Sequence, residues 1–247
     1  MTSTPLYFSA SPFGLLRIVY DPAFNARVLL SGATRHGMQS VDPARSTEPM
    51  AYYHRTGPLG DIFTAWRAPA GAHVGIVGLG VGGIAAYAEP GQRFTFFELD
   101  PGVVKIATDP QYFTYLSQCR GTYDIVLGDG RESLEKTPDG SFDLLILDAL
   151  QDGLIPPHLV SPDAVRMYLR KLTALGLLVF DINTDGPVQP ALKRVAAEDG
   201  LVCLFRADLD VSEAERAGGK LQSYYMVLTR ELAAVAGLAK VPNWFAT

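Results

Sequence analysis

The chain of 247 residues is 48% hydrophobic and 19% charged, as in an ordinary soluble globular protein, and it is long enough for one α/β domain with a smaller appendage. Its net charge of −5 argues against nucleic acid and against an anionic membrane as a partner. The sequence has no apolar run of about eighteen residues, so no membrane-spanning helix is predicted.

Residues 1–45 predict short β-strands joined by turns. Two apolar stretches, at 15–20 and 27–30, are separated by a turn sequence. Because an isolated hairpin is only marginally stable in water, we expect this region to pack on the main domain or on a second subunit. Residues 48–67 predict a helix that is interrupted around Gly57.

A buried strand followed by a glycine-rich turn is predicted at residues 74–83. Glycine is required where the backbone takes a positive φ, or where a Cβ would hold the chain away from a ligand. A short helix at 84–88 and a strand at 94–97 follow, and this strand ends in Glu98, twenty positions after Gly78. The order is that of a βαβ nucleotide-binding unit whose terminal acid binds ribose hydroxyls.

The rest of the chain continues the alternation of helices and strands. Helices are expected at 101–107, 131–136, 162–173 and 190–199, and strands at 123–127, 142–147, 177–180, 201–205 and 222–229. This alternation predicts a Rossmann-like α/β fold with a mostly parallel sheet. The expected organisation is an N-terminal β-region (1–45), a Rossmann-like domain (46–230) and a C-terminal tail (231–247).

Acidic residues follow three successive strands of this predicted sheet. Glu98, Asp129 and Asp148 stand at carboxyl ends of strands, which share one edge of a parallel sheet, where such folds bind ligands. We expect Glu98 to bind the ribose, Asp129 the adenine amino group, and Asp148 to face the reacting end. An acid at one such position can equally be a helix N-cap. The glycines also match the dinucleotide fingerprint, so the residues alone leave both NAD and S-adenosylmethionine (SAM) open.

Six short segments give the chain a resemblance to the spermidine synthase group of class I SAM-dependent transferases: 36–40, 52–60, 78–83, 97–100, 128–131 and 147–149. The resemblance covers residues 29–229. It implies a seven-stranded class I methyltransferase fold, a small N-terminal β-domain, a homodimer, and SAM or its decarboxylated form as co-substrate rather than NAD. The implied catalytic residues are Asp148 and Tyr53. The implied nucleoside-binding residues are Gln39, Gly78, Gly80, Gly82, Glu98, Leu99, Asp129, Gly130 and Asp148.

The chain departs from spermidine synthases at the residues that bind the amine. Val81 stands where they carry an acid inside the glycine turn. Gln151 replaces the second acid of their catalytic segment, and Asp152 follows one position late. Because each buried ammonium of a polyamine needs a partner, these losses argue against a polyamine substrate. A cation at His54 or Arg55 would instead attract the α-carboxylate of intact SAM, which favours SAM itself.

Attack at the γ-carbon of SAM or decarboxylated SAM transfers an aminocarboxypropyl or aminopropyl group, or closes a ring, and releases methylthioadenosine. The family geometry implies this reaction, with Asp148 orienting the amine and accepting its proton. The acceptor is then a small-molecule amine or SAM itself. A small-molecule methyltransferase, a non-catalytic nucleoside-binding protein and an NAD oxidoreductase are the alternatives. The residues expected at the substrate are His54, Arg55, Gln151, Asp152, Tyr224 and Tyr225.

The cysteines and histidines predict no further site. Cys119 and Cys203 fit neither a disulfide framework nor a metal-site spacing, and the four histidines have no paired spacing. Reduced, buried thiols are typical of a cytoplasmic protein, and residues 1–10 lack the pattern of a signal peptide. We therefore expect a cytoplasmic protein without a metal.

Overall fold

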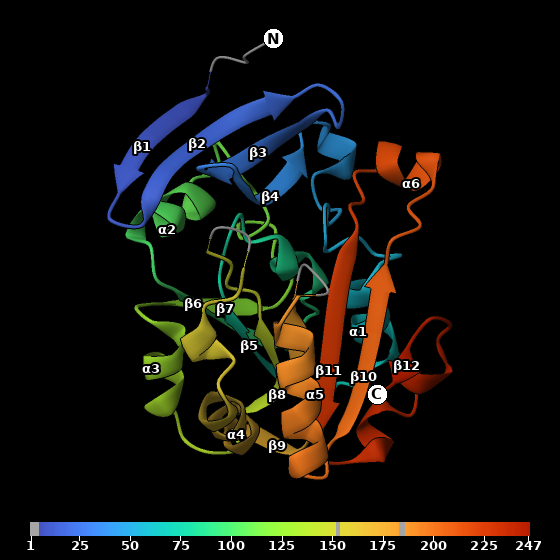
Figure 1. Ribbon diagram of the computed structural model, residues 1–247. Helices are drawn as coiled ribbons and strands as arrows, with labels where there is room; N and C mark the ends of the chain where they lie inside the picture. Colours follow the sequence, from blue (N-terminus) through green and yellow to red (C-terminus); the bar gives the residue numbers. More distant parts are fainter. Residues whose placement is uncertain (1–4, 152–153, 183–185) are drawn as a thin grey trace.

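The computed structural model describes residues 5–151, 154–182 and 186–247, and its strands form two separate sheets (Figure 1). The first is antiparallel and consists of β1 (Tyr7–Ser11), β2 (Gly14–Asp21), β3 (Ala26–Ser31) and β4 (Thr34–Ser40), in that order. Leu16, Ile18 and Leu29 of this sheet are buried in the main hydrophobic core. The N-terminal sheet is thus stabilised by packing on the main domain.

The central sheet has eight strands in the order β12-β10-β11-β9-β8-β5-β6-β7. They are β5 (His73–Val77), β6 (Arg93–Glu98), β7 (Thr122–Leu127), β8 (Phe142–Leu147), β9 (Leu172–Asp181), β10 (Val202–Asp208), β11 (Ser223–Thr229) and β12 (Phe245–Ala246). Strands β5 to β9 pair in parallel, whereas β11 is antiparallel to both of its neighbours. The predicted α/β class with a mostly parallel sheet is confirmed.

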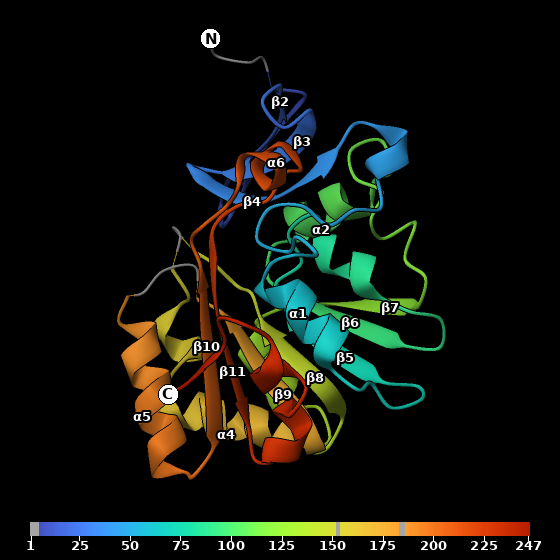
Figure 2. The same cartoon turned by 90° about the vertical axis from the view of Figure 1, so that its right-hand side faces the viewer.

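Helices cover both faces of the central sheet (Figure 2). They are α1 (Pro58–Ala65), α2 (Pro101–Thr108), α3 (Gly130–Glu135), α4 (Pro162–Lys171), α5 (Val188–Glu198) and α6 (Glu213–Ala217). Side chains alternate between the faces along each strand: Ile76 of β5 packs in the core that contains α1, and Val77 in the core that contains α4 and α5.

Three local features differ from expectation. The segment after the glycine turn is a 3₁₀ turn, Gly83–Tyr87, rather than an α-helix; Pro90 follows closely and cannot continue a helix. The helix expected within 48–67 begins only at Pro58. The C-terminal tail, expected to be loose, adds β12 to the edge of the seven predicted strands, because Trp244 is buried and its Nε1 donates to Asp61 at 3.0 Å.

The N-terminal sheet lies over the edge of the central sheet at which the parallel strands end, and α6, between β10 and β11, reaches the same level (Figures 1 and 2). The N-terminal sheet therefore covers the carboxyl ends of the parallel strands. In the part of the chain that the structure describes, no helix is both long and apolar enough to cross a membrane.

Candidate functional site

A cavity lies between the strand ends of the central sheet and the N-terminal sheet. The central sheet contributes residues that end β5, β6 and β8 or follow β7: Gly78, Gly80, Glu98, Leu99, Asp100, Asp129, Gly130 and Asp148. The N-terminal sheet and the turns on its edge contribute Phe13, Leu16, Ser31, Arg35 and His36, and the remaining polar lining residues are Tyr52, Tyr53, Gln151 and His158. The three acids predicted at the strand ends therefore share one cavity.

The glycine turn brings β5 close to two other backbones. Gly78 has a φ of 102°, and a Cβ there would lie 2.4 Å from the carbonyl oxygen of Asp148. Gly80 has a φ of 52°, and a Cβ there would lie 2.3 Å from the carbonyl oxygen of His36. These contacts exclude any larger residue at both positions. Gly82, also predicted to contact the nucleoside, faces the Leu116 side chain instead and is not among the cavity-lining residues.

Glu98 is held at the end of β6 by backbone amides. Its Oε2 accepts from Leu79 N at 2.9 Å, and its Oε1 accepts from Asp100 N at 2.8 Å. Burial raises the pKa of this carboxyl, although the two amide donors favour its ionised form. Because each carboxylate oxygen has a further lone pair, Glu98 can still accept hydrogen bonds from a ligand in the cavity.

Asp129 caps helix α3 and pairs with a histidine. Its Oδ1 accepts from Glu132 N at 3.0 Å, and its Oδ2 lies 3.1 Å from Nε2 of His158. Burial would raise the pKa of Asp129, but the hydrogen bonds from the Glu132 amide and from His158 outweigh it and hold the pKa below its usual value. The helix-cap alternative therefore applies to Asp129, and the same residue also lines the cavity.

Asp148 is the buried acid of the site. The Tyr53 hydroxyl donates to its Oδ2 at 2.6 Å. Leu147 pairs with Phe180 in the parallel register of β8 and β9, which places Asp148 beside Asp181, a fully buried carboxyl at the end of β9. Burial first, and then the charge of Asp181, raise the pKa of Asp148 well above its usual value. Asp148 lines the cavity, and Asp181 is a second buried carboxyl beside it, outside the cavity lining.

Asp181 was not predicted as a site residue. It ends a strand in the same way as the three predicted acids do, so its position carried the same signal. Tyr225 pairs with it across β9 and β11 and is fully buried; neither of the two residues is among the cavity-lining residues. Tyr224, the other predicted tyrosine, packs on the opposite core and does not line the cavity either.

Several other predicted residues lie away from the cavity. The Gln39 side chain donates to Ser46 O at 2.7 Å and accepts from Thr114 N at 2.8 Å, so its amide joins two loops. Arg55 forms an ion pair with Glu48, and its guanidinium lies over the Tyr87 ring. Among the predicted substrate residues, Gln151 lines the cavity, and Asp152 lies outside the described residues.

The residues predicted to set the choice of sulfonium are also placed differently from expectation. Val81 is buried with its methyl groups against Gly37, outside the cavity lining. His54 lies beside Thr56, with Nδ1 3.1 Å from Oγ1, and is not a lining residue either. Instead, the cationic and imidazole groups on the N-terminal side of the cavity are Arg35 and His36.

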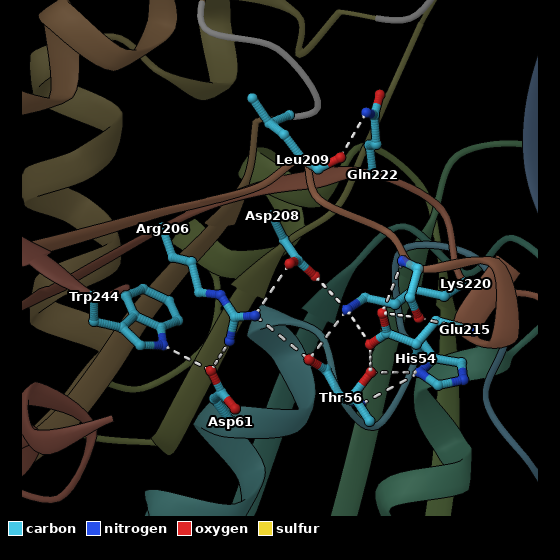
Figure 3. A network of polar contacts seen from close by, with 11 residues as sticks. His54, Thr56, Asp61, Arg206, Asp208, Leu209, Glu215, Lys220, Gln222 and Trp244 are labelled. Atoms are coloured by element: carbon cyan, nitrogen blue, oxygen red, sulfur yellow. Dashed lines mark hydrogen bonds and ion pairs between the residues drawn. The ribbon is translucent and has the colours of Figure 1, made fainter. Parts of the chain in front are cut away.

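A network of charged side chains ties Thr56 and Asp61 to the hairpin of β10 and β11 (Figure 3). Lys220 Nζ lies 2.9 Å from Asp208 Oδ2 and 2.8 Å from Glu215 Oε1. Thr56 Oγ1 donates to the same Glu215 oxygen at 2.7 Å. Arg206 extends the network by pairing with Asp208 and with Asp61 of helix α1. Together, the contacts of this network hold in place the segment that carries Tyr53.

The described residues contain no group of three or more histidine, cysteine or acidic side chains arranged to hold a metal ion. Both cysteines are free thiols, with Cys203 buried and Cys119 half-buried.

No family model and no curated protein matches this sequence. Solved structures do match it. A probable spermidine synthase from Corynebacterium glutamicum ATCC 13032 matches with a TM-score of 0.68 at 13% identity, over 99% of this chain and 91% of the other. Spermidine synthase from Thermotoga maritima matches with a TM-score of 0.67 at 16% identity, over 94% of this chain and 75% of the other. A spermidine synthase in complex with the transition-state analogue AdoDATO matches with a TM-score of 0.67 at 16% identity, over 94% of this chain and 76% of the other.

The chain is therefore an α/β protein with a spermidine synthase-like fold, as the resemblance implied. At these identities the match shows the fold alone.

Proposed function

We propose that this protein is a SAM-type transferase in which an amine attacks the γ-carbon of a sulfonium nucleoside and methylthioadenosine leaves. The observation that carries the proposal is the buried Asp148 carboxyl, bonded to Tyr53, in one cavity with Glu98 and Asp129. A nucleoside-binding rim and a proton acceptor at the next strand end are what this reaction needs.

In this proposal the nucleoside lies along the strand ends. Glu98 accepts hydrogen bonds from the ribose hydroxyls, since its two oxygens keep free lone pairs beside the backbone amides. Asp129 accepts a hydrogen bond from the adenine amino group, in competition with His158. The glycine turn lets the methionine part of the co-substrate approach the backbone closely.

Asp148 acts on the amine. A free amine with a pKa of about 10.4 is mostly protonated at neutral pH, and freeing it costs on the order of 4–5 kcal/mol. The ionised Asp148 orients the ammonium and accepts its proton, while the new N–C bond forms and the C–S bond breaks. The electron pair of the C–S bond goes to sulfur, which leaves as the neutral thioether of methylthioadenosine. Tyr53 positions the carboxylate through its 2.6 Å hydrogen bond.

The released nucleoside tests the proposal. The protein is incubated with SAM or with decarboxylated SAM, each with and without small amines and amino acids, and the nucleoside is identified by mass spectrometry. Methylthioadenosine is the expected product. S-adenosylhomocysteine would instead establish a methyltransferase, and binding without any release would establish a non-catalytic nucleoside-binding protein. Calorimetry that shows NAD binding with SAM inert would overturn the assignment.

The pH dependence of turnover should reflect the carboxyl pair. Because only ionised Asp148 accepts a proton, and burial and Asp181 raise its pKa, activity is lost as the pH falls through that raised value. Asp181→Asn removes one negative charge and lowers the pKa of Asp148. The acid limb of kcat/KM for methylthioadenosine release should therefore move to lower pH in the variant. A limb that stays in place, or moves to higher pH, would contradict this role of Asp181.

A further inference from the structure

The charges of the cavity wall are unevenly distributed. Among the described residues, its lining contains four acids, Glu98, Asp100, Asp129 and Asp148, and a single permanently cationic side chain, Arg35. Sulfonium and ammonium groups match the acidic wall. A carboxylate would be repelled there, because two like charges a few ångströms apart in a partly desolvated site cost several kcal/mol. Arg35 is therefore the place in this cavity that accepts a carboxylate.

The Arg35 guanidinium is held in place by neighbouring side chains, which do not use all of its N–H donors. Its Cζ lies over the Phe24 ring, 5.4 Å from the centroid, and its Nη1 lies 3.0 Å from Met38 Sδ. It forms an ion pair with Asp21, whose Oδ2 lies 3.6 Å from Nη2, longer than a hydrogen bond. Since a guanidinium has five N–H donors, these contacts leave donors for a ligand. The stacked ring limits the rotation of the group and so lowers the cost of binding.

A series of contacts connects the backbone of Arg35 to the reacting end of the cavity. The Tyr52 hydroxyl donates to Arg35 O at 3.3 Å, the Tyr52 ring lies edge-on to Tyr53 at 5.9 Å, and Tyr53 reaches Asp148. Burial raises the pKa of Tyr52 to about 12, with Arg35 lowering it and Asp181 and Asp148 raising it. Tyr52 therefore contacts the backbone of Arg35 with its hydroxyl and the Tyr53 ring with its own ring.

The cavity wall thus offers a partner for each charge of an α-amino acid, acidic side chains for its ammonium group and Arg35 for its carboxylate. A carboxylate on the co-substrate would gain a cationic partner at Arg35, whereas an aminopropyl group, which has no carboxylate, would make no use of that cation. His36 adds a polar group to the same wall, with its carbonyl against Gly80 of the glycine turn. The turn is the part of the fold along which the methionine end of SAM would lie.

We propose that Arg35, on the N-terminal sheet, binds the α-carboxylate of intact SAM and selects it over decarboxylated SAM. The inference rests on the proposed function, because it concerns the same cavity and the same sulfonium. It assigns the N-terminal sheet a role in choosing the co-substrate, and it replaces the cation that the sequence placed at His54 or Arg55.

Calorimetric titration of the full chain with SAM, decarboxylated SAM and methylthioadenosine tests the inference. Wild-type protein should bind SAM at least as tightly as decarboxylated SAM. Arg35→Gln should weaken SAM binding by about ten- to a hundredfold, the range for a lost charge-assisted hydrogen bond, and leave the other two affinities unchanged. Arg35→Lys should retain part of the preference. Arg17→Gln is the matched control, because Arg17 lies on the same sheet, donates to Gly32 O at 2.8 Å and does not line the cavity.

Equal losses for SAM and decarboxylated SAM in Arg35→Gln would overturn the inference. So would a tenfold or greater wild-type preference for decarboxylated SAM, a result that needs no variant and decides the question even if Arg35→Gln does not fold. Binding of methylthioadenosine distinguishes a failure of the proposed function from a failure of the role assigned to Arg35. If the wild type does not bind it, the proposed function fails as well; if it binds and Arg35→Gln shows no selective loss, only the role of Arg35 fails.

Discussion

Asp148→Asn should lower turnover by about 10²–10⁴-fold, the usual range for the loss of a general base, while nucleoside affinity stays close to wild type. The amide has the shape of the carboxyl and still accepts from Tyr53, whose hydroxyl lies 2.6 Å from Asp148 in the wild type. It cannot accept the proton of the attacking amine. The measurements are the rate of methylthioadenosine release at saturating co-substrate and the affinity for methylthioadenosine itself.

Asp143→Asn is the control on the same strand. Asp143 lies near the start of β8, at the opposite end from Asp148, where its Oδ2 accepts from His73 N at 3.0 Å and its Oδ1 from Thr173 Oγ1 at 3.1 Å. Turnover should change little in this variant. Wild-type turnover in Asp148→Asn, with methylthioadenosine still released, would show that Asp148 is structural and that the proton acceptor lies elsewhere.

Glu98→Ala should weaken the binding of SAM and methylthioadenosine by at least tenfold. The ribose would lose hydrogen bonds of the charge-assisted class, each worth about 1.5–3 kcal/mol. The backbone amides of Leu79 and Asp100 would also lose their acceptor, which loosens the glycine turn. Calorimetry gives the affinities, and thermal unfolding of the free protein shows how much of the loss comes from that loosening.

Two comparisons separate ribose recognition from a general loss of structure. Glu89 precedes β6, pairs with Arg120 and does not line the cavity. The nucleoside affinity of Glu89→Ala should therefore match that of wild type. Glu98→Gln keeps the size of the side chain and one carbonyl acceptor, so its affinity should fall between those of wild type and Glu98→Ala. Unchanged methylthioadenosine affinity in Glu98→Ala would refute the ribose role.

The order of the elements and the rim of acids could be predicted because they depend on local patterns. Apolar runs of strand length alternate with helical segments, and a parallel sheet places the residue after each strand at one edge. Glu98, Asp129 and Asp148 therefore meet in one cavity, as expected. The same rule applies to Asp181 at the end of β9, where the sequence carried the signal and the prediction did not use it.

The residues that the tertiary structure alone decided are those whose direction depends on contacts between distant segments. Gln39 and Arg55 belong to motifs near the site. In the folded chain, however, Gln39 accepts a hydrogen bond from Thr114 N, and Arg55 forms an ion pair with Glu48, so neither side chain is directed by its local sequence alone. Trp244 orders the tail by burying its ring against α1, a contact that no local pattern contains.

The same distinction holds for the charge of the cavity. The sequence by itself determined that the strand ends are acidic, since each acid follows directly on its own strand. Only the packing of the N-terminal sheet over those ends decided that Arg35 lines the same cavity and Arg55 does not. Charge acts through space, and two residues twenty positions apart in the chain differ in which side of the fold they reach.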